Sequence, residues 1–373
     1  MTVPARKVLL NPGPATTTDS VKQAQIVSDI CPRETEFGDL MRSVQSDLTR
    51  IVHGGEDYTS VLFCGSGTIC IDAALSSLLP EGAKVLVVDN GVYSSRAVEV
   101  CTYYGLSHID LKLPINRPID VEAVRAVLSE EGDIALVYTT HHETATGVLN
   151  PLREIGALAH EYGALFVVDT TSSYAMIPLD VVRDNIDACM ASAQKGIQAM
   201  TGLSFIIAKR AVIEESAANP KRSYYCNLYR QYDQFERTGQ MHFTPPVQVV
   251  YAARQALDEY FAEGEQAKWE RHQHLAQAIH EGLSRLGFSE AIDSEYQSQL
   301  VVSVSFPDCA QWDFRAVHDY CYERGFTIYP GKIAGQDTFR LCTLGALEVA
   351  DIEAFFKVLE AALEDLGIAT ARL

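Results

Sequence analysis

The sequence predicts an α/β protein with a large domain, built on a mainly parallel, doubly wound sheet, and a smaller α+β domain at the C-terminal end. Short runs rich in Val and Ile alternate with helical patterns between residues 59 and 208, which is typical of a parallel sheet covered on both faces. After Pro245-Pro246 the alternation stops and a long helical stretch begins. The 373 residues, 47% of them hydrophobic, are enough for two domains.

The first part of the chain supplies the predicted large sheet. Buried strands are expected at 59–64, 84–89, 134–138, 165–169, 188–191 and 203–208. Helices are expected at 69–79, 97–104 and 152–162, the last opened by Pro151. In a doubly wound sheet of this kind, ligands bind at the carboxyl ends of the strands. Residues directly after these strands are therefore candidates for a functional site.

The second part of the chain follows a different pattern. A long helix is expected over 247–287, broken near Glu263-Gly264, followed by strand 300–306, helix 313–324, strands 326–329 and 338–342, and helix 349–366. No low-complexity linker separates the two parts, so we expect the boundary inside the connecting helix. The predicted domains are 1–255, including the N-terminal segment, and 256–373.

Charge and composition exclude several classes of function. The formal net charge is −19, so a nucleic-acid partner is not expected, and an anionic substrate needs a local cationic pocket. Nine cysteines are scattered without CxxC pairs, which favours reduced thiols in a cytoplasmic protein over a metal site or a disulfide framework. No run reaches the roughly 20 apolar residues of a membrane span.

Asp169 and Lys195 form the pair with the clearest chemical meaning. Asp169 ends an apolar strand, and Lys195 follows the next predicted strand among small and polar neighbours. Pyridoxal phosphate (PLP) needs these two groups, because a lysine bonds covalently to its aldehyde and an acid keeps its ring nitrogen protonated. Alone, the aspartate could be an ordinary strand-end acid and the lysine an exposed side chain.

A phosphate site is predicted at Cys64-Gly-Ser-Gly-Thr68, which follows a strand and opens a helix. The glycines allow close approach, and the helix N-terminus offers free N–H groups and a positive dipole. By itself the motif is weak evidence, because it lacks the ending of a P-loop and the full dinucleotide fingerprint. Its position before Asp169 and Lys195 gives it weight.

Further candidates also follow predicted strands. Residues 138–147 are rich in hydroxyl and imidazole groups, which suits either a site or a solvated turn with capping threonines. Tyr93 is either a core aromatic or a ring that lies flat on a planar cofactor. Arg340 is a lone arginine in an apolar strand, where it either forms a structural ion pair or binds an oxyanion of the substrate. Arg33 either binds the substrate or is a surface charge.

Together these motifs resemble the fold-type I PLP-dependent enzymes, and within them the small aminotransferase branch that includes alanine–glyoxylate and 2-aminoethylphosphonate–pyruvate transaminases. The resemblance extends from residue 8 to about residue 345. The segments that carry it are 9–18, 29–34, 63–68, 89–93, 142–151, 168–173, 192–195, 243–245 and 328–332. Asn11-Pro-Gly-Pro14 and the segment 30–34 point to the phosphonate subgroup.

The resemblance implies a role for each candidate residue. Lys195 would carry PLP and act as general acid/base, Asp169 would pair with the ring nitrogen, and Tyr93 would stack on the ring. The other implied cofactor ligands are Thr144 at the phenolic oxygen and Ser66, Gly67, Thr68 and Gln194 at the phosphate. Thr244 would reach the phosphate in the neighbouring subunit, which implies a homodimer with shared sites. Arg340 would bind the carboxylate of pyruvate or alanine, and Arg33 is the candidate for the phosphonate.

The implied reaction converts 2-aminoethylphosphonate and pyruvate to phosphonoacetaldehyde and L-alanine. Gly196 and the turn 199–202 depart from the pattern of the resemblance, so the amine donor stays open. The alternatives are alanine–glyoxylate or serine–pyruvate exchange, and a PLP lyase such as a cysteine desulfurase, for which Cys342 is a poor nucleophile candidate. A non-catalytic regulator is a further alternative, which the intact Lys195 and Asp169 disfavour.

Overall fold

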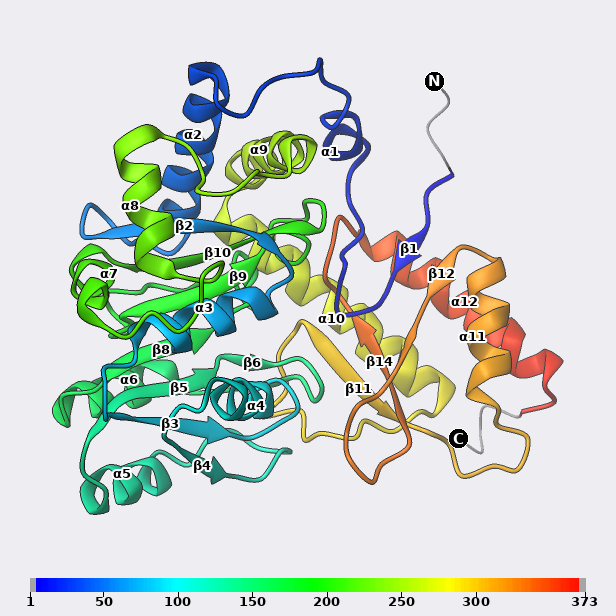
Figure 1. Cartoon of the computed structure of the whole chain (residues 1–373). Helices are drawn as coiled ribbons and strands as arrows, with labels where there is room; N and C mark the ends of the chain where they lie inside the picture. The colour runs from blue at the N-terminus through cyan, green and yellow to red at the C-terminus, as the bar shows by residue number, and fades with distance from the viewer. Residues whose placement is uncertain (1–4, 369–373) are drawn as a thin grey trace.

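The structure, a computed structural model that describes residues 5–368, confirms the predicted α/β fold class (Figure 1). The large sheet has seven strands, and all but β10 point the same way, since β10 runs antiparallel to both its neighbours while the other pairs are parallel. Their spatial order is β2 (Tyr58–Gly65), β10 (Gly202–Lys209), β9 (Ala188–Ser192), β8 (Leu165–Asp169), β5 (Ile134–Thr140), β3 (Lys84–Asp89) and β4 (His108–Lys112).

Helices cover both faces of this sheet, and the strands alternate between the two cores. Within β3, Leu86 and Val88 pack on one face, whereas Val85 and Val87 pack on the other. Burying each of these side chains contributes about 1.5–3 kcal/mol. One face is covered by α2 (Thr35–Ile51), α5 (Val121–Glu130), α6 (Leu152–Glu161) and α9 (Val247–Glu263), the other by α3 (Thr68–Leu78), α4 (Ser95–Tyr104), α7 (Arg210–Glu215) and α8 (Leu228–Thr238).

A smaller antiparallel sheet lies beside the large one, with α10 running between them in Figure 1. Its strands are β11 (Val301–Ser305), β14 (Thr338–Cys342) and β13 (Tyr329–Pro330), and its helices are α10 (Glu265–Leu286), α11 (Phe314–Glu323) and α12 (Val349–Asp365). The helix predicted over 247–287 breaks at Gly264, whose φ of +83° suits glycine. The strand predicted at 326–329 is divided, because β12 (Phe326–Thr327) pairs with β1 (Val8–Leu9) and β13 pairs with β14.

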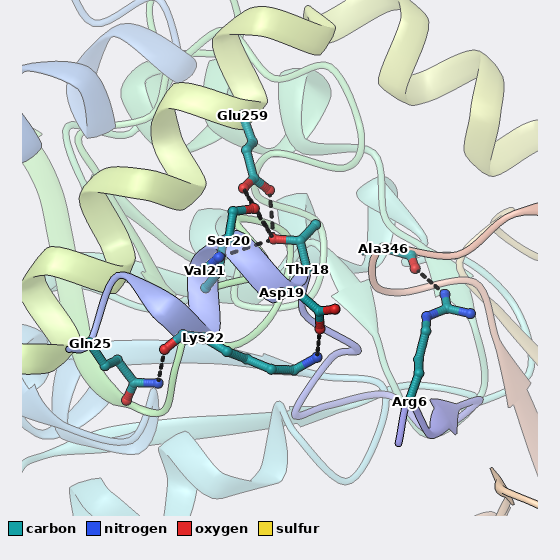
Figure 2. A network of polar contacts seen from close by, with 9 residues as sticks. All are labelled: Arg6, Thr18, Asp19, Ser20, Val21, Lys22, Gln25, Glu259 and Ala346. Atoms are coloured by element: carbon teal, nitrogen blue, oxygen red, sulfur yellow. Dashed lines mark hydrogen bonds and ion pairs between the residues drawn. The ribbon is translucent and has the colours of Figure 1, made fainter. Parts of the chain in front are cut away.

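The N-terminal segment is fixed at both of its ends. At one end β1 pairs with β12, although the sequence grouped this segment with the large domain. At the other end Thr18 caps α1 (Asp19–Gln23) and, with Ser20, donates hydrogen bonds to Glu259 of α9 (Figure 2). Residues 11–16 are held between these anchors, beside Lys195. The boundary predicted at 255/256 falls inside α9 and stays a prediction.

The remaining short elements are β6 (His142–Glu143), β7 (Val148–Leu149) and a 3₁₀ turn at Ser216–Ala218. Of the helices within residues 5–368, none has the length and apolarity that crossing a bilayer requires.

Candidate active site

Most of the predicted site residues converge because their strands point the same way. The carboxyl ends of β2, β3, β5, β8 and β9 open at one edge of the sheet. A cavity of about 140 Å³ lies there. The predicted residues that line it are Ser66, Gly67, Thr68, Tyr93, Thr144, Asp169, Gln194 and Lys195. The order of the motifs along the chain therefore becomes one site in space.

Lys195 stands in the turn after β9, against the N-terminal segment. Its Nζ donates a hydrogen bond to the carbonyl oxygen of Pro12. A Cβ atom at Gly13 would lie 2.6 Å from Cδ and Cε of the lysine, so this contact requires glycine. Burial lowers the pKa of Lys195 to about 8, and the charges of Arg340 and Arg96 act in the same direction. The amine is therefore closer to its neutral, nucleophilic form than an exposed lysine at the same pH.

The turn that carries Lys195 is supported from behind by α10. Lys268 is 2% exposed, and its Nζ donates a 2.7 Å hydrogen bond to the carbonyl oxygen of Gly196. A Cβ at Gly196 would lie 1.9 Å from the carbonyl oxygen of Tyr174, so this residue faces packed backbone and does not line the cavity. The unexpected glycine after the lysine is thus explained by packing, not by the shape of the substrate pocket.

Asp169 is a buried carboxylate without a cationic partner. It is 6% exposed at the end of β8, and its Oδ1 accepts a 2.8 Å hydrogen bond from the backbone N–H of Thr171. Within residues 5–368 no lysine, arginine or histidine forms an ion pair with it. Burial raises the pKa of Asp169, against the hydrogen bonds from Thr171. A cationic group in the cavity would restore its ionised form.

The anion-binding end of the cavity is the start of α3. Gly67 occupies the N-cap position without a side-chain cap, and Thr68 begins the helix. The N–H groups of Ile69 and Cys70 donate to the carbonyl oxygens of Ser66 and Gly67, whereas within residues 5–368 those of Gly67 and Thr68 make no hydrogen bond to protein. These two N–H groups keep their hydrogen-bonding capacity for a ligand. A Cβ at Gly67 would lie 3.1 Å from Cγ2 of Thr171, which is tighter than usual contact. A larger residue would crowd this end of the cavity.

Tyr93 is held in place through the backbone by Glu143. This fully buried carboxylate accepts hydrogen bonds from the backbone N–H groups of Tyr93 at 3.1 Å, Ser94 at 3.4 Å and Ala145 at 3.2 Å. Burial raises the pKa of Glu143 to about 7, although these three hydrogen bonds oppose the change. The turn after β3 and the turn after β5 are thereby joined on one side of the cavity.

The predicted polar segment after β5 is a hydrogen-bonded network and not a solvated turn. Thr144 Oγ1 donates to Ser172 Oγ at 2.8 Å. His142 also lines the cavity, and its two ring nitrogens contact Ser172 Oγ at 2.8 Å and Ser298 Oγ at 2.7 Å. Burial lowers the pKa of His142 to about 3, so the ring is neutral at physiological pH. Ser298 lies just before β11, so this network reaches the smaller sheet.

Arg340 lies on β14 next to the cavity and is 1% exposed. Its guanidinium donates to the carbonyl oxygens of Thr144 at 3.2 Å and Pro330 at 3.1 and 3.3 Å. Within residues 5–368 no carboxylate pairs with it, so the expected alternative of a structural ion pair is not observed. Its charge is free to bind an anion.

Arg33 and Thr244 do not reach the cavity within one subunit. Both residues are exposed, and Thr244 belongs to the segment between α8 and α9. Arg33 donates to the carbonyl oxygen of Met241 at 2.7 Å, and its own carbonyl oxygen accepts from Gln240. The two predicted residues thus belong to segments that contact each other on the surface.

The sequence did not predict four residues that contact or support the site: Arg96, His142, Glu143 and Lys268. His142 and Glu143 belong to the segment already singled out by its polarity. Arg96 follows Tyr93 by one helical turn, and its position in the first turn of α4 was the available indication. Lys268 gave no indication, because it stands in a helix rich in exposed charges.

A larger cavity of about 510 Å³ lies between α1, α9 and α10, but both arginines that line it are already paired with carboxylates. Arg6 binds Asp351, and Arg271 binds Glu263 at 2.6 Å. The smaller cavity at the strand ends is therefore the candidate active site.

Comparisons with known proteins identify the family of the chain. The sequence model of the class-V aminotransferases matches residues 19–346. The 2-aminoethylphosphonate–pyruvate transaminase 1 of Burkholderia lata is 36% identical over 366 residues, which cover 98% of this chain and 99% of that protein. The enzyme of the same name from Cupriavidus pinatubonensis is 35% identical over 362 residues, covering 97% of this chain and 95% of that protein.

Solved structures share the fold. Alanine–glyoxylate aminotransferase from Nostoc sp. superposes with a TM-score of 0.89 at 26% identity, covering 97% of this chain and 96% of that one. Ureidoglycine–glyoxylate aminotransferase from Bacillus subtilis gives a TM-score of 0.89 at 22% identity, covering 98% and 95% of the two chains. The family model matches most of the chain, and a relative 36% identical to it aligns over 98% of its length. The chain therefore belongs to the class-V aminotransferase family.

Proposed function

We propose that this protein is a PLP-dependent aminotransferase that converts 2-aminoethylphosphonate and pyruvate to phosphonoacetaldehyde and L-alanine. The observation that carries the proposal is the meeting of Lys195, Asp169 and the start of α3 in one cavity. The relatives named for this reaction match nearly the whole chain at 35–36% identity. A cytoplasmic location is part of the proposal, because the nine cysteines are free.

The cavity fits PLP by the chemistry of its residues. Asp169 is a buried carboxylate that lacks a cation, which the protonated ring nitrogen would supply. Thr140 lines the cavity, and its Oγ1 is buried without a hydrogen-bond partner. The phosphate would lie at Ser66, Gly67, Thr68 and Gln194, the ring against Tyr93, and the phenolic oxygen near Thr144. When bound, PLP supplies an electron sink for the negative charge left when a proton leaves the substrate carbon.

Lys195 is the residue that would carry the cofactor and move this proton. Its pKa of about 8 leaves a useful fraction of the neutral amine near neutral pH, so it can accept a proton from the substrate carbon and return one. The backbone at Pro12 and Gly13 limits where the amine can lie. Asp169 would keep the ring nitrogen protonated, since a buried carboxylate stabilises a cation beside it.

Arg340 would bind the anionic end of the substrates. Three of its five N–H groups donate to backbone carbonyl oxygens, which leaves one on each terminal nitrogen for a carboxylate, and its charge has no carboxylate partner within residues 5–368. The phosphonate of 2-aminoethylphosphonate and the carboxylate of pyruvate occupy the site at different times in an exchange of this type. One arginine could therefore serve both.

A homodimer would complete the site. Thr244 is exposed and lies outside its own subunit's cavity, in agreement with a contact to the partner's cofactor phosphate. Arg33 contacts the same segment and would accompany it, which supports Arg33 as a phosphonate ligand in the neighbouring subunit. We also keep the domain boundary at 255/256, inside α9, as a proposal.

The rival activities differ in the support they have. Alanine–glyoxylate exchange is the second candidate, since a solved structure of that name shares the fold at 26% identity. Cysteine desulfuration is disfavoured, because Cys342 is fully buried and burial raises the pKa of its thiol to about 12.

A donor and acceptor profile tests the proposal. The purified protein, supplied with PLP, is incubated with pyruvate or glyoxylate and one amine at a time, and the amino acid formed is quantified. We expect alanine formation from 2-aminoethylphosphonate and pyruvate, with little product from serine. A preference for alanine with glyoxylate would assign the protein to the second candidate. The Lys195→Ala variant should form no product from any pair.

A further inference from the structure

The predicted phosphate site lacks a formal positive charge. A phosphate monoester carries about −1.5 to −2 charges near pH 7. Ser66, Gly67, Thr68 and Gln194 are all neutral, and the start of α3 supplies only about half an elementary charge. The net charge of −19 opposes an anion further. A cation close to Thr68 is therefore needed to balance the ligand.

Arg96 is that cation by position. It belongs to the first turn of α4, lines the cavity, and donates a 3.1 Å hydrogen bond from Nη1 to Oγ1 of Thr68. Its guanidinium carbon lies 5.0 Å from the centre of the Tyr93 ring. One side chain thus contacts both the start of α3 and the ring that would lie on the cofactor.

The guanidinium also keeps most of its binding capacity. Within residues 5–368 it forms no ion pair, and the bond to Thr68 is its one hydrogen bond to protein. An arginine has five N–H groups, so the others remain for a ligand. It lines the same cavity as Asp169 and Lys195, and its positive charge lowers the pKa of both.

We infer that Arg96 binds the phosphate of the cofactor, and that it couples this contact to Tyr93. The inference rests on the proposed function, because it takes PLP as the ligand. A charge-assisted hydrogen bond to phosphate is stronger than the neutral contacts from Ser66 and Thr68. Arg96 would also keep Thr68 oriented and hold its own plane against the Tyr93 ring. It is a binding residue, with no part in proton transfer.

Binding measurements on the cofactor-free protein test this assignment without using activity. Affinity is measured for PLP and for pyridoxal, which has the same ring and aldehyde but no phosphate. Arg96→Gln should bind PLP at least tenfold more weakly, while its affinity for pyridoxal stays within about twofold of the unaltered protein. Arg96→Lys, which keeps the charge without the fork, should lie between. Inorganic phosphate should compete with PLP less effectively in Arg96→Gln.

A matched control is Arg324→Gln, which removes a guanidinium stacked 3.4 Å from the ring centre of Tyr320 on α11 and should leave both affinities unchanged. Circular dichroism confirms that the variants fold. An equal loss of affinity for PLP and pyridoxal in Arg96→Gln, or no loss for either, would overturn the inference. Failure of the unaltered protein to bind PLP would instead overturn the proposed function, so the two failures are distinct.

Discussion

Lys268, which supports the turn that carries Lys195, tests how the burial of a lysine changes the stability of the protein with pH. It is buried in α10 and donates to the carbonyl oxygen of Gly196. Burial lowers its pKa from 10.5 to about 7, although the charges of Glu259 and Glu263 oppose the change. Between these two pKa values the unfolded chain binds a proton that the folded chain does not. The free energy of unfolding therefore rises with pH across that window.

The magnitude follows from the same pKa values. Each pKa unit is about 1.4 kcal/mol, so the full window from about pH 7 to 10.5 corresponds to about 5 kcal/mol. Between about pH 6 and pH 9 the contribution is about 2–3 kcal/mol. In Lys268→Met the free energy of unfolding no longer depends on pH through this side chain. The variant also loses about 1 kcal/mol of stability, because the hydrogen bond to Gly196 is absent.

Urea unfolding of the cofactor-free protein at several pH values measures the effect, with both proteins at the same concentration. The stability of the unaltered protein minus that of Lys268→Met should increase with pH by the amount given above. The titration of Lys195 is common to both proteins and cancels. Lys268→Arg keeps its charge throughout and should show no such increase. A stability difference that stays constant from pH 6 to pH 9 would refute the reasoning.

Three further substitutions test the site. Gly13→Ala places a Cβ 2.6 Å from the Lys195 side chain, at a φ of +128° that disfavours alanine. Amino transfer by this variant should slow at least tenfold in a single-turnover assay. Gly132→Ala, whose Cβ would lie in open space, should leave the rate of amino transfer unchanged. Gly196→Ala should lower stability in urea by about 1–3 kcal/mol or more, because its Cβ would overlap the carbonyl oxygen of Tyr174. Arg340→Gln should raise the KM for pyruvate by about tenfold to a hundredfold while PLP affinity is unchanged, and a loss of PLP affinity would contradict the role of Arg340.

The large sheet was predictable because its central strands are continuous apolar runs. β3 and β8 lie where the sequence predicts them, and the residues after them reach the cavity. The edge strand β4 was not predicted, since it is partly exposed along its length and carries alternating polar residues, as edge strands do. The pairing of β1 with β12 joins residues more than 300 positions apart, and no local pattern encodes such a pairing.

The site was predictable where a residue ends a strand or follows it within a few positions. Asp169, Lys195 and Tyr93 are of this kind. Arg96 was missed because its contact with Thr68 depends on how α4 packs against α3. Lys268 was missed because composition favours exposure for lysine, and its burial depends on α10 passing behind the Lys195 turn.

Thr244 and the phosphonate role of Arg33 were predicted from the resemblance, and both residues lie outside the cavity of their own subunit. A substrate ligand supplied by a second subunit cannot be found from the contacts of one chain. Sedimentation of the protein measures whether it forms a dimer. The affinity of the Thr244→Ala variant for PLP measures whether Thr244 contributes to the site.

The central claim is that this chain transfers the amino group of 2-aminoethylphosphonate to pyruvate through PLP held on Lys195. The visible absorption spectrum of the PLP-loaded protein tests it most directly, because the cofactor reports its own chemical state. With 2-aminoethylphosphonate and no acceptor, the band of the lysine-bound aldehyde should disappear, and pyruvate should restore it. A band that ignores this amine but disappears with alanine or serine would contradict the claim, and the rival aminotransferases would take its place.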